Sequence, residues 1–102
     1  MKALKGSQKK YLRALAHDLK PAAFVGQKGV TISLIKEIND GLDANELVKV
    51  KFVDFKEKNI KTALAMEIAQ HTKSYLAGLI GHMAIYYRKN SDAQKHRIVI
   101  PE

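Results

Sequence analysis

Several features that are common in small proteins are missing from this chain of 102 residues. It contains no cysteine, which excludes disulfide bonds and thiolate metal sites and is compatible with a reducing compartment. No apolar run approaches the roughly 18 residues that a membrane-spanning helix needs. The N-terminal stretch MKALKGSQKK is basic but lacks the apolar core of a signal peptide. We therefore expect a cytoplasmic protein with no membrane association.

The chain also lacks internal repeats, low-complexity tracts and any linker long enough to divide it. Hydrophobic residues make up 46% and charged residues 27% of the sequence, a balance that supports both a buried core and a soluble surface. A chain of this length normally folds without disulfide or metal staples. We expect residues 1–102 to form one domain, and the protein to be a monomer.

Acidic residues are scarce in the first third of the chain. Residues 1–36 contain eight Lys and Arg but one acid, Asp18, whereas residues 37–102 contain ten basic and nine acidic residues. The first region therefore carries +7 of the total net charge of +8. Such concentrated charge is typical of proteins that bind a polyanion, most often nucleic acid, although a basic surface can also be simply solvated.

Three helices and four strands are expected from the spacing of apolar residues and from cap and stop signals. Ser7 precedes the first helical pattern, Pro21 follows it, and Thr31 precedes the second. Between them, AAFVG has the composition of a short buried strand. The expected helices are 8–19, 32–42 and 56–73, with a short helical turn at 75–79, and the expected strands are 22–26, 46–55, 82–89 and 97–101.

The apolar positions also predict which faces are buried. One stripe of the first helix is apolar: Leu12, Leu15, Ala16 and Leu19. In the second strand Val48, Val50 and Phe52 alternate with Lys49 and Lys51, and this period of two indicates one buried and one solvent-facing side.

The predicted order of elements is αβαβαββ. A strand, a crossover helix and a second strand favour a parallel unit, and the last two strands can pair as a hairpin. The alternation at 48–52 indicates that one face of the sheet is open. We therefore expect an α+β fold of two layers, in which the helices cover one face of a four-stranded mixed sheet.

Two glycines three residues apart, Gly26 and Gly29, flank Gln27 and Lys28 between the first strand and the second helix. Glycine reaches positive φ and has no Cβ to keep a ligand away. Such a turn exposes N–H groups at a helix N-terminus, where partial positive charge attracts phosphate, and Lys28 adds a full charge. The GQKG loop therefore suits contact with a phosphodiester backbone, although the same four residues also suit a tight turn without a ligand.

Two familiar phosphate-binding signatures are absent from the sequence. Neither the Walker A pattern nor the dinucleotide fingerprint G-x-G-x-x-G occurs. The remaining type is the KH-like loop, in which G-x-x-G clamps the backbone of single-stranded RNA.

Longer stretches around this loop resemble a known family. LKPAAFVGQKGVT, LIKEINDGL, ELVKVKF and IGHMAIYYR look like the CRM domain (chloroplast RNA splicing and ribosome maturation), and SQKKYLRALAHDLKP resembles the start of its bacterial stand-alone YhbY branch. The resemblance covers about residues 7–101. It implies a fold similar to the C-terminal domain of bacterial translation initiation factor three, RNA binding, and association with precursors of the large ribosomal subunit.

The resemblance also implies which residues contact RNA, namely the loop residues Gly26, Gln27, Lys28 and Gly29. The basic side chains that we expect to neutralise nearby phosphates are Lys9, Lys10, Arg13, Lys20 and Lys36. A second set of candidates would share the open face of the sheet, where Tyr86 could stack on a base: Lys49, Lys51, Tyr86 and Arg88.

Residue spacing does not support other chemistry. The histidines fall on different predicted elements without metal-ligand spacing, and no serine stands in a nucleophile context, so we expect no metal, cofactor or catalytic residue. The leading hypothesis is a non-enzymatic RNA-binding protein that acts on ribosomal RNA during large-subunit assembly. Two alternatives stay open: a protein-interaction module that docks on a ribosomal protein through the open sheet, and a phosphate-ester-handling enzyme that uses the same anion site.

Overall fold

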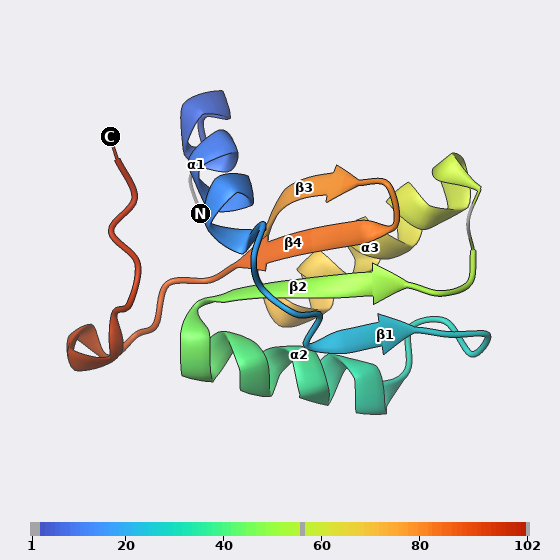
Figure 1. Cartoon of the computed structure of the whole chain (residues 1–102). Coiled ribbons are helices and arrows are strands. Elements are labelled where there is room, and N and C mark those ends of the chain that lie inside the picture. Colours follow the sequence, from blue (N-terminus) through green and yellow to red (C-terminus); the bar gives the residue numbers. More distant parts are fainter. Residues whose placement is uncertain (1–2, 56, 102) are drawn as a thin grey trace.

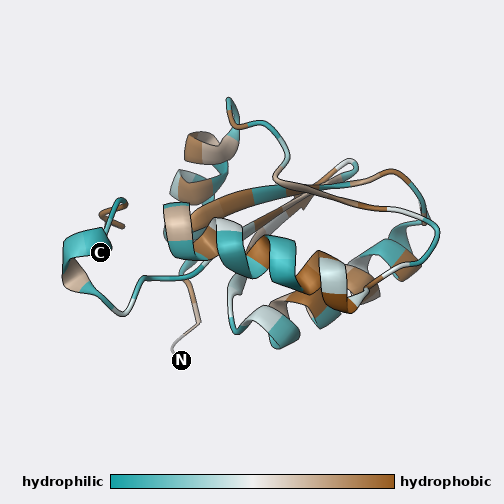
Figure 2. Cartoon of the chain, turned by 90° about the horizontal axis from the view of Figure 1, so that it is seen from below, coloured by the Kyte–Doolittle hydropathy of each residue, from teal (hydrophilic) through white to brown (hydrophobic). Residues whose placement is uncertain are grey.

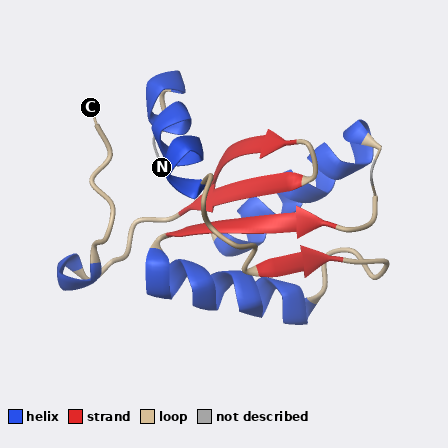
Figure 3. Cartoon of the chain, in the orientation of Figure 1, coloured by secondary structure: helices blue, strands red, loops and turns tan. Residues whose placement is uncertain are grey.

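The computed structural model describes residues 3–55 and 57–101. Its elements are α1 (Gly6–Ala16), β1 (Ala23–Val25), α2 (Ile32–Asn45), β2 (Leu47–Phe52), α3 (Lys58–Thr72), β3 (Tyr75–Ile80), β4 (Met83–Tyr87) and a 3-10 turn (Ala93–Lys95). The strands form one mixed sheet in the order β1-β2-β4-β3, with β1 parallel to β2 and β4 antiparallel to both of its neighbours (Figure 1, Figure 3). The predicted α+β class and four-stranded mixed sheet are confirmed.

The β1-α2-β2 unit forms where the sequence signals predict it. The Thr31 hydroxyl accepts a hydrogen bond from the Leu34 N–H at 3.0 Å, which satisfies one of the free donors at the start of α2. At the other end, Glu46 has a left-handed backbone with φ of 65°, and its N–H bonds to the carbonyl of Leu42. The helix therefore runs to Asn45, one turn beyond its predicted end, and the chain then turns directly into β2.

Helices cover both faces of the sheet, so the prediction that all of them lie on one face is wrong. On one face, α2 and α3 enclose a core that includes Val50, Phe52 and Tyr86. On the other, Leu12 of α1 packs against Ile85 and neighbouring residues. Strand β4, with the sequence MAIYY, is apolar at every position, so both of its sides need cover. In Figure 1 the connection that leaves α1 passes in front of the sheet and α3 lies behind it, and in Figure 2 the strands are mostly hydrophobic while the helices are mixed.

Strand β3 occupies the segment for which a short helical turn was expected. Its pairing with β4 shifts register between Leu76 and Gly78, which marks a bulge that breaks the alternation normally used to recognise a strand. Gly78 also packs closely against α1, since an added Cβ would lie 2.5 Å from Cδ of Arg13. The strand was not predicted because the bulge interrupts the alternation of its apolar residues.

The C-terminal segment is not the fourth strand of the prediction. Both edges of β4 are already paired, with β2 and β3, so β4 has no edge left for a further hairpin partner. Instead, the N–H groups of Arg97 and Ile98 donate to one carboxylate oxygen of Glu46 at 2.6 and 3.1 Å, and Asn90 N–H donates to the other at 2.6 Å. Ile98 and Ile100 then pack against the α1 core.

The buried face of α1 differs from its predicted stripe. In α1, Leu12 and Ala16 are fully buried but Leu15 is exposed, because only one narrow side of this helix meets the sheet. The helix ends at Ala16 and not at the predicted Leu19, which is exposed in the connection that follows. The helix also begins earlier than predicted, with Lys5 rather than Ser7 at the N-cap. In α3, the buried positions are Lys61, Ala65, Ile68 and Thr72. The expected start of this helix at Lys56 lies outside the described residues.

The two α1 leucines give a matched test of this packing. Leu12 has no exposed surface and Leu15 is 41% exposed, so we expect Leu12→Ala to lower the free energy of unfolding by about 2–5 kcal/mol. Leu15→Ala should cost less than about 1 kcal/mol, because Leu15 is already partly in contact with water in the folded protein. Urea unfolding of both variants measures the difference, and equal costs would mean that the assigned facing of α1 is incorrect.

Glu46 gives the fold a defined pH dependence. Burial alone would raise the pKa of Glu46, but the three backbone donors and the charge of His96 outweigh it, and the pKa lies below its ordinary value. Ionised Glu46 therefore stabilises the fold above its unfolded-state pKa of about 4.3, and this contribution is lost as pH falls through the lower folded-state pKa.

We expect Glu46→Gln to lower the free energy of unfolding by about 2 kcal/mol at neutral pH, because charged hydrogen bonds are replaced by weaker ones. The gap between parent and variant should shrink as the pH falls below the unfolded-state pKa of about 4.3 and through the lower folded-state pKa of Glu46. Glu57→Gln, at an exposed glutamate, is the control and should unfold like the parent. A gap that stays constant down to acidic pH would contradict the role given to the Glu46 carboxylate.

Candidate nucleic-acid interface

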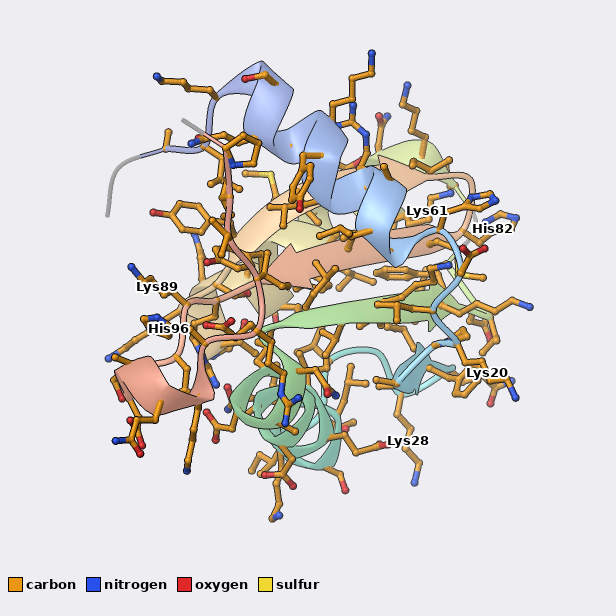
Figure 4. All side chains as sticks on the ribbon, turned by 60° about the vertical axis from the view of Figure 1, so that its left-hand side comes forward. Lys20, Lys28, Lys61, His82, Lys89 and His96 are labelled. Atoms are coloured by element: carbon orange, nitrogen blue, oxygen red, sulfur yellow. The ribbon has the colours of Figure 1, made fainter. Side chains whose placement is uncertain are left out.

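The GQKG loop forms a tight turn between β1 and α2. The Gly29 N–H donates to the Gly26 carbonyl at 2.9 Å, so Gln27 and Lys28 are the two central residues of the turn. Both side chains are exposed, and Figure 4 shows Lys28 extending away from the body of the protein. The turn therefore presents a full positive charge at its tip.

The two glycines of the loop have different structural roles. Gly29 has φ of 69°, a conformation that other residues adopt only with strain, so the turn itself requires glycine at this position. Gly26 has no such φ, and an added Cβ there would meet no atom within 4 Å. Neither the backbone nor the packing therefore requires glycine at Gly26, and the surface above it is open.

Contacts at the end of β1 and from the residues that follow β2 fix the position of the loop. The carbonyl of Val25, at the end of β1, accepts hydrogen bonds from the N–H groups of Val53 and Asp54 at 3.0 and 3.2 Å. The ring of Phe55 lies beside Gly29. The first turn of α2 contains no acidic residue to offset the partial positive charge at its N-terminus, and Glu37 follows in the next turn. These features together make a fixed, positively charged turn that suits a phosphate group.

The basic residues of α1 do not lie beside this loop. Helix α1 packs over the end of the sheet where Leu47 begins β2, whereas the loop follows the opposite end, where β1 and β2 finish (Figure 1). Arg13 also donates to the carbonyl of Ala77 at 3.2 Å, which ties its guanidinium to β3. Lys9 and Lys10 lie on the same helix, so the structure separates these three predicted contacts from the GQKG loop.

The other predicted lysines fall into two groups, those that have a partner within the described residues and those that do not. Lys36 pairs with Asp40 at 3.0 Å, and Lys49 donates to the carbonyl of His17 at 3.0 Å. Lys20 is exposed in the connection from α1 to β1, and in Figure 4 it lies with Lys28 away from Lys89 and His96. Lys51 lies on β2 directly beside Phe24 of β1. Lys20, Lys28 and Lys51 have no hydrogen-bond or ion-pair partner among the described residues.

Tyr86 and Arg88 are not on an open face, and the prediction that they share one with lysines is wrong. Tyr86 is fully buried in the core between the sheet and α3, where its hydroxyl donates to the carbonyl of Ala65 at 2.8 Å. Burial raises the pKa of this hydroxyl far above its ordinary value. The Arg88 guanidinium donates to Asn39, Asp43 and the carbonyl of Thr72, which joins β4 to α2 and α3. Both residues stabilise the fold.

One further basic pair was missed by the sequence reasoning. Lys61 of α3 is buried, and its amine donates to the carbonyl of Gly81 at 2.5 Å and lies 3.3 Å from Nδ1 of His82. The His82 carbonyl accepts from the Phe52 N–H at 2.7 Å, so this pair belongs to the loop end of the sheet. Figure 4 shows the Lys61 and His82 side chains next to each other. No sequence spacing predicts the contact, because the two residues come from different elements.

The described part of the chain offers few other kinds of site. Within residues 3–55 and 57–101, no group of three or more His, Asp or Glu side chains is arranged to hold a metal ion. None of the helices in the same ranges combines the length and the apolar character that crossing a membrane requires.

The fold and the loop define a class of protein: a small α+β domain with a basic G-x-x-G turn between a parallel strand and a helix. The family model of the CRS1/YhbY (CRM) domain matches residues 4–88. The chain therefore belongs to the CRS1/YhbY (CRM) domain family, as the resemblance predicted.

Similar proteins carry consistent descriptions. A Pseudomonas aeruginosa protein named as a probable RNA-binding protein is 36% identical over 94 residues, which cover 92% of this chain and 89% of the relative. A Haemophilus influenzae protein named as an RNA-binding protein is 34% identical over 94 residues, covering 92% and 94%. The solution structure of a Staphylococcus aureus protein, provisionally described as RNA binding, matches with a TM-score of 0.80 at 35% identity, covering 96% and 99%.

The different roles of the two glycines can be tested by stability. We expect Gly29→Ala to cost about 1–2 kcal/mol, because its φ of 69° forces a Cβ into the left-handed region. Gly26→Ala should change the free energy of unfolding by less than about 0.5 kcal/mol, since the added methyl meets open space. Chemical denaturation of the two variants gives both values. A large cost at Gly26 would show that this glycine serves the turn rather than a ligand.

Proposed function

We propose that this protein binds RNA through the GQKG loop, without catalysis, and acts on ribosomal RNA in precursors of the large subunit during ribosome assembly. The observation that carries the proposal is the open surface above Gly26 beside the exposed Lys28 amine. Membership of the CRM family and the names of the relatives support RNA as the polyanion. The resemblance to the YhbY branch supports the large-subunit precursor as its source.

The grip on RNA is directed at the backbone. A phosphate at the turn receives N–H groups from the loop and the start of α2, together with the charge of Lys28. Lys51 lies beside β1 and supplies a second cation for a neighbouring phosphate. Contacts of this kind position the RNA and carry no information about its sequence. The loop therefore accounts for affinity and register, and base choice must come from another part of the surface.

A second candidate function is docking on a ribosomal protein. It is favoured by exposed apolar side chains on α1, in the connection that follows it and on the C-terminal segment: Tyr11, Leu15, Leu19 and Val99. This surface lies away from the GQKG loop. RNA binding by the purified protein, with no other factor present, separates the two functions, since a protein-docking module would need its partner to associate with ribosomal particles.

The loop is tested by replacing Gln27 and Lys28 together with aspartate while both glycines remain. We expect the affinity for a fluorescently labelled single-stranded RNA to fall at least tenfold, about 1.4 kcal/mol, because the local charge changes from +1 to −2. The melting temperature should stay unchanged, since both side chains are exposed. Cosedimentation with large-subunit precursors in cell extracts should fall in parallel.

The chain contains its own matched control. Gln94 and Lys95 form the same dipeptide in the exposed 3-10 turn near the C-terminus, so Gln94→Asp with Lys95→Asp makes the identical charge change elsewhere. The control should retain most of the parent affinity. Equal losses in both double variants would argue for general charge attraction and against a specific loop.

If about five phosphates are contacted, raising salt from about 50 to 200 mM should weaken parent binding roughly 100-fold.

A further inference from the structure

Phe24 is an aromatic side chain that the fold leaves outside both cores. Its neighbours on β1, Ala23 and Val25, face α2 and α3 and are buried, so Phe24 points to the opposite side of the sheet. It is 56% exposed on an edge strand, two residues before Gly26. A single exposed apolar residue is ordinary and needs no functional explanation. The surroundings of Phe24 supply the reason to consider one.

Phe24 forms one wall of a hollow of about 230 Å³ next to the GQKG loop. The loop forms the second wall, and Ser33 and Glu37 of α2 line the third. Ser33 and Glu37 are four residues apart, so they stand next to each other on the same helix face, and both are exposed. The hollow therefore combines an aromatic surface, two hydrogen-bonding side chains and a phosphate-binding turn.

We propose that this hollow binds one unpaired RNA base, which stacks on Phe24 and turns its hydrogen-bonding edge toward Ser33 and Glu37. The inference rests on the proposed function, because the phosphate of the same nucleotide is held by the loop. Unpaired bases are recognised in this way, by stacking on an aromatic ring and by hydrogen bonds to their exposed edges. The charge of Lys28 and Lys51 on either side of Phe24 complements the flanking phosphates.

Glu37 gives the hollow a preference among bases. A carboxylate accepts hydrogen bonds and repels phosphate, so it is an unsuitable partner for the RNA backbone. It pairs well with the amino group of cytosine, and uracil carries no amino group. The site is therefore expected to favour cytosine over uracil, which makes Glu37 a specificity-determining residue and Lys28 a residue for affinity.

Stacking is tested with a fluorescent reporter at the proposed contact. The chain contains no tryptophan, so Phe24→Trp introduces a unique fluorophore. We expect Phe24→Trp to keep the parent affinity for a short oligocytidylate and its emission to be quenched on binding. Inorganic polyphosphate, which has charge but no bases, should compete for the loop without quenching. Equal quenching by polyphosphate and RNA would overturn the stacking contact.

Affinity measurements test the same contact without the reporter. Phe24→Ala should weaken binding of oligocytidylate by about fivefold to 150-fold, the range found for loss of one base–aromatic stack. Ile80→Ala is the matched control, since Ile80 is also 56% exposed and lies on the opposite edge strand of the same sheet face. It should bind like the parent. Melting temperatures of both variants should match that of the parent, which confirms that folding is intact.

The preference among bases is measured as the ratio of the affinities for oligocytidylate and oligouridylate. The parent should bind oligocytidylate at least about fivefold more tightly than oligouridylate. Glu37→Gln should bring this ratio close to one, because the amide can donate to uracil as well as accept from cytosine. Asp40 lies three residues after Glu37 on the same helix, and Asp40→Asn removes the same charge. It should raise the affinities for both oligonucleotides and leave their ratio unchanged.

The outcomes separate this inference from the function on which it rests. If Phe24→Ala binds like the parent while the Gln27 and Lys28 double variant loses affinity, the base site is wrong and the loop grip stands. If Phe24→Ala weakens binding but Glu37→Gln leaves the cytosine preference intact, Glu37 does not read the base. If neither the loop variant nor Phe24→Ala changes RNA affinity, both proposals fail.

Discussion

The arrangement of the molecule depends on one constraint, the alternation of side-chain direction along the two central strands, β2 and β4. Successive residues of β2 and β4 face opposite sides, so Val50 and Tyr86 enter one core while Leu47 and Ile85 enter the other. The first core receives two helices, but the second receives α1 alone. Helix α1 packs over the end of the sheet where β2 begins. Phe24, on the same face beside the GQKG loop, is 56% exposed, so this end of the face is left uncovered.

This arrangement explains how the loop can be both rigid and accessible. The Val25 carbonyl is fixed by two N–H donors from the β2–α3 connection, and Thr31 fixes the start of α2. The turn between them needs no reorganisation to meet a phosphate, and binding to a preorganised site loses less conformational entropy. Because α1 is anchored at the far end, partly by Arg13 on β3, it does not obstruct the approach.

The sequence predicted those elements whose signals are local. The Thr31 cap, the glycines of the loop and the alternation at 48–52 each determine structure through neighbours in the chain. The turn, α2 and β2 were predicted with the right type and place, although α2 extends to Asn45 and β2 ends at Phe52. Errors arose where distant residues decide the outcome. The bulged part of β3 packs against Arg13 of a distant helix, and the C-terminal segment binds Glu46, about 50 residues earlier in the chain, instead of pairing with a strand edge.

The candidate site also combines a part that local sequence predicts with a part that depends on distant residues. The GQKG loop could be identified from four consecutive residues, but its surroundings could not, because they come from β2, α2 and the β3–β4 turn. Charge in the first third of the chain suggested that α1 would flank the loop, and the structure places α1 elsewhere. The sequence AAFVG predicts a short buried strand, and nothing in it indicates that the Phe24 side chain faces away from both cores.

Because the two cores lie on opposite sides of one sheet, one of them can unfold locally while the other stays folded. The core under α1 is small, and the C-terminal segment that completes it is fastened mainly through Glu46. Local unfolding proceeds in cooperative units, and the least stable units have the fewest buried contacts. We infer that helix α1 and the C-terminal segment form such a unit. Amide hydrogens there are then expected to exchange with solvent sooner than those of β2 and α2, while the β1-α2-β2 scaffold keeps the GQKG turn in its folded geometry.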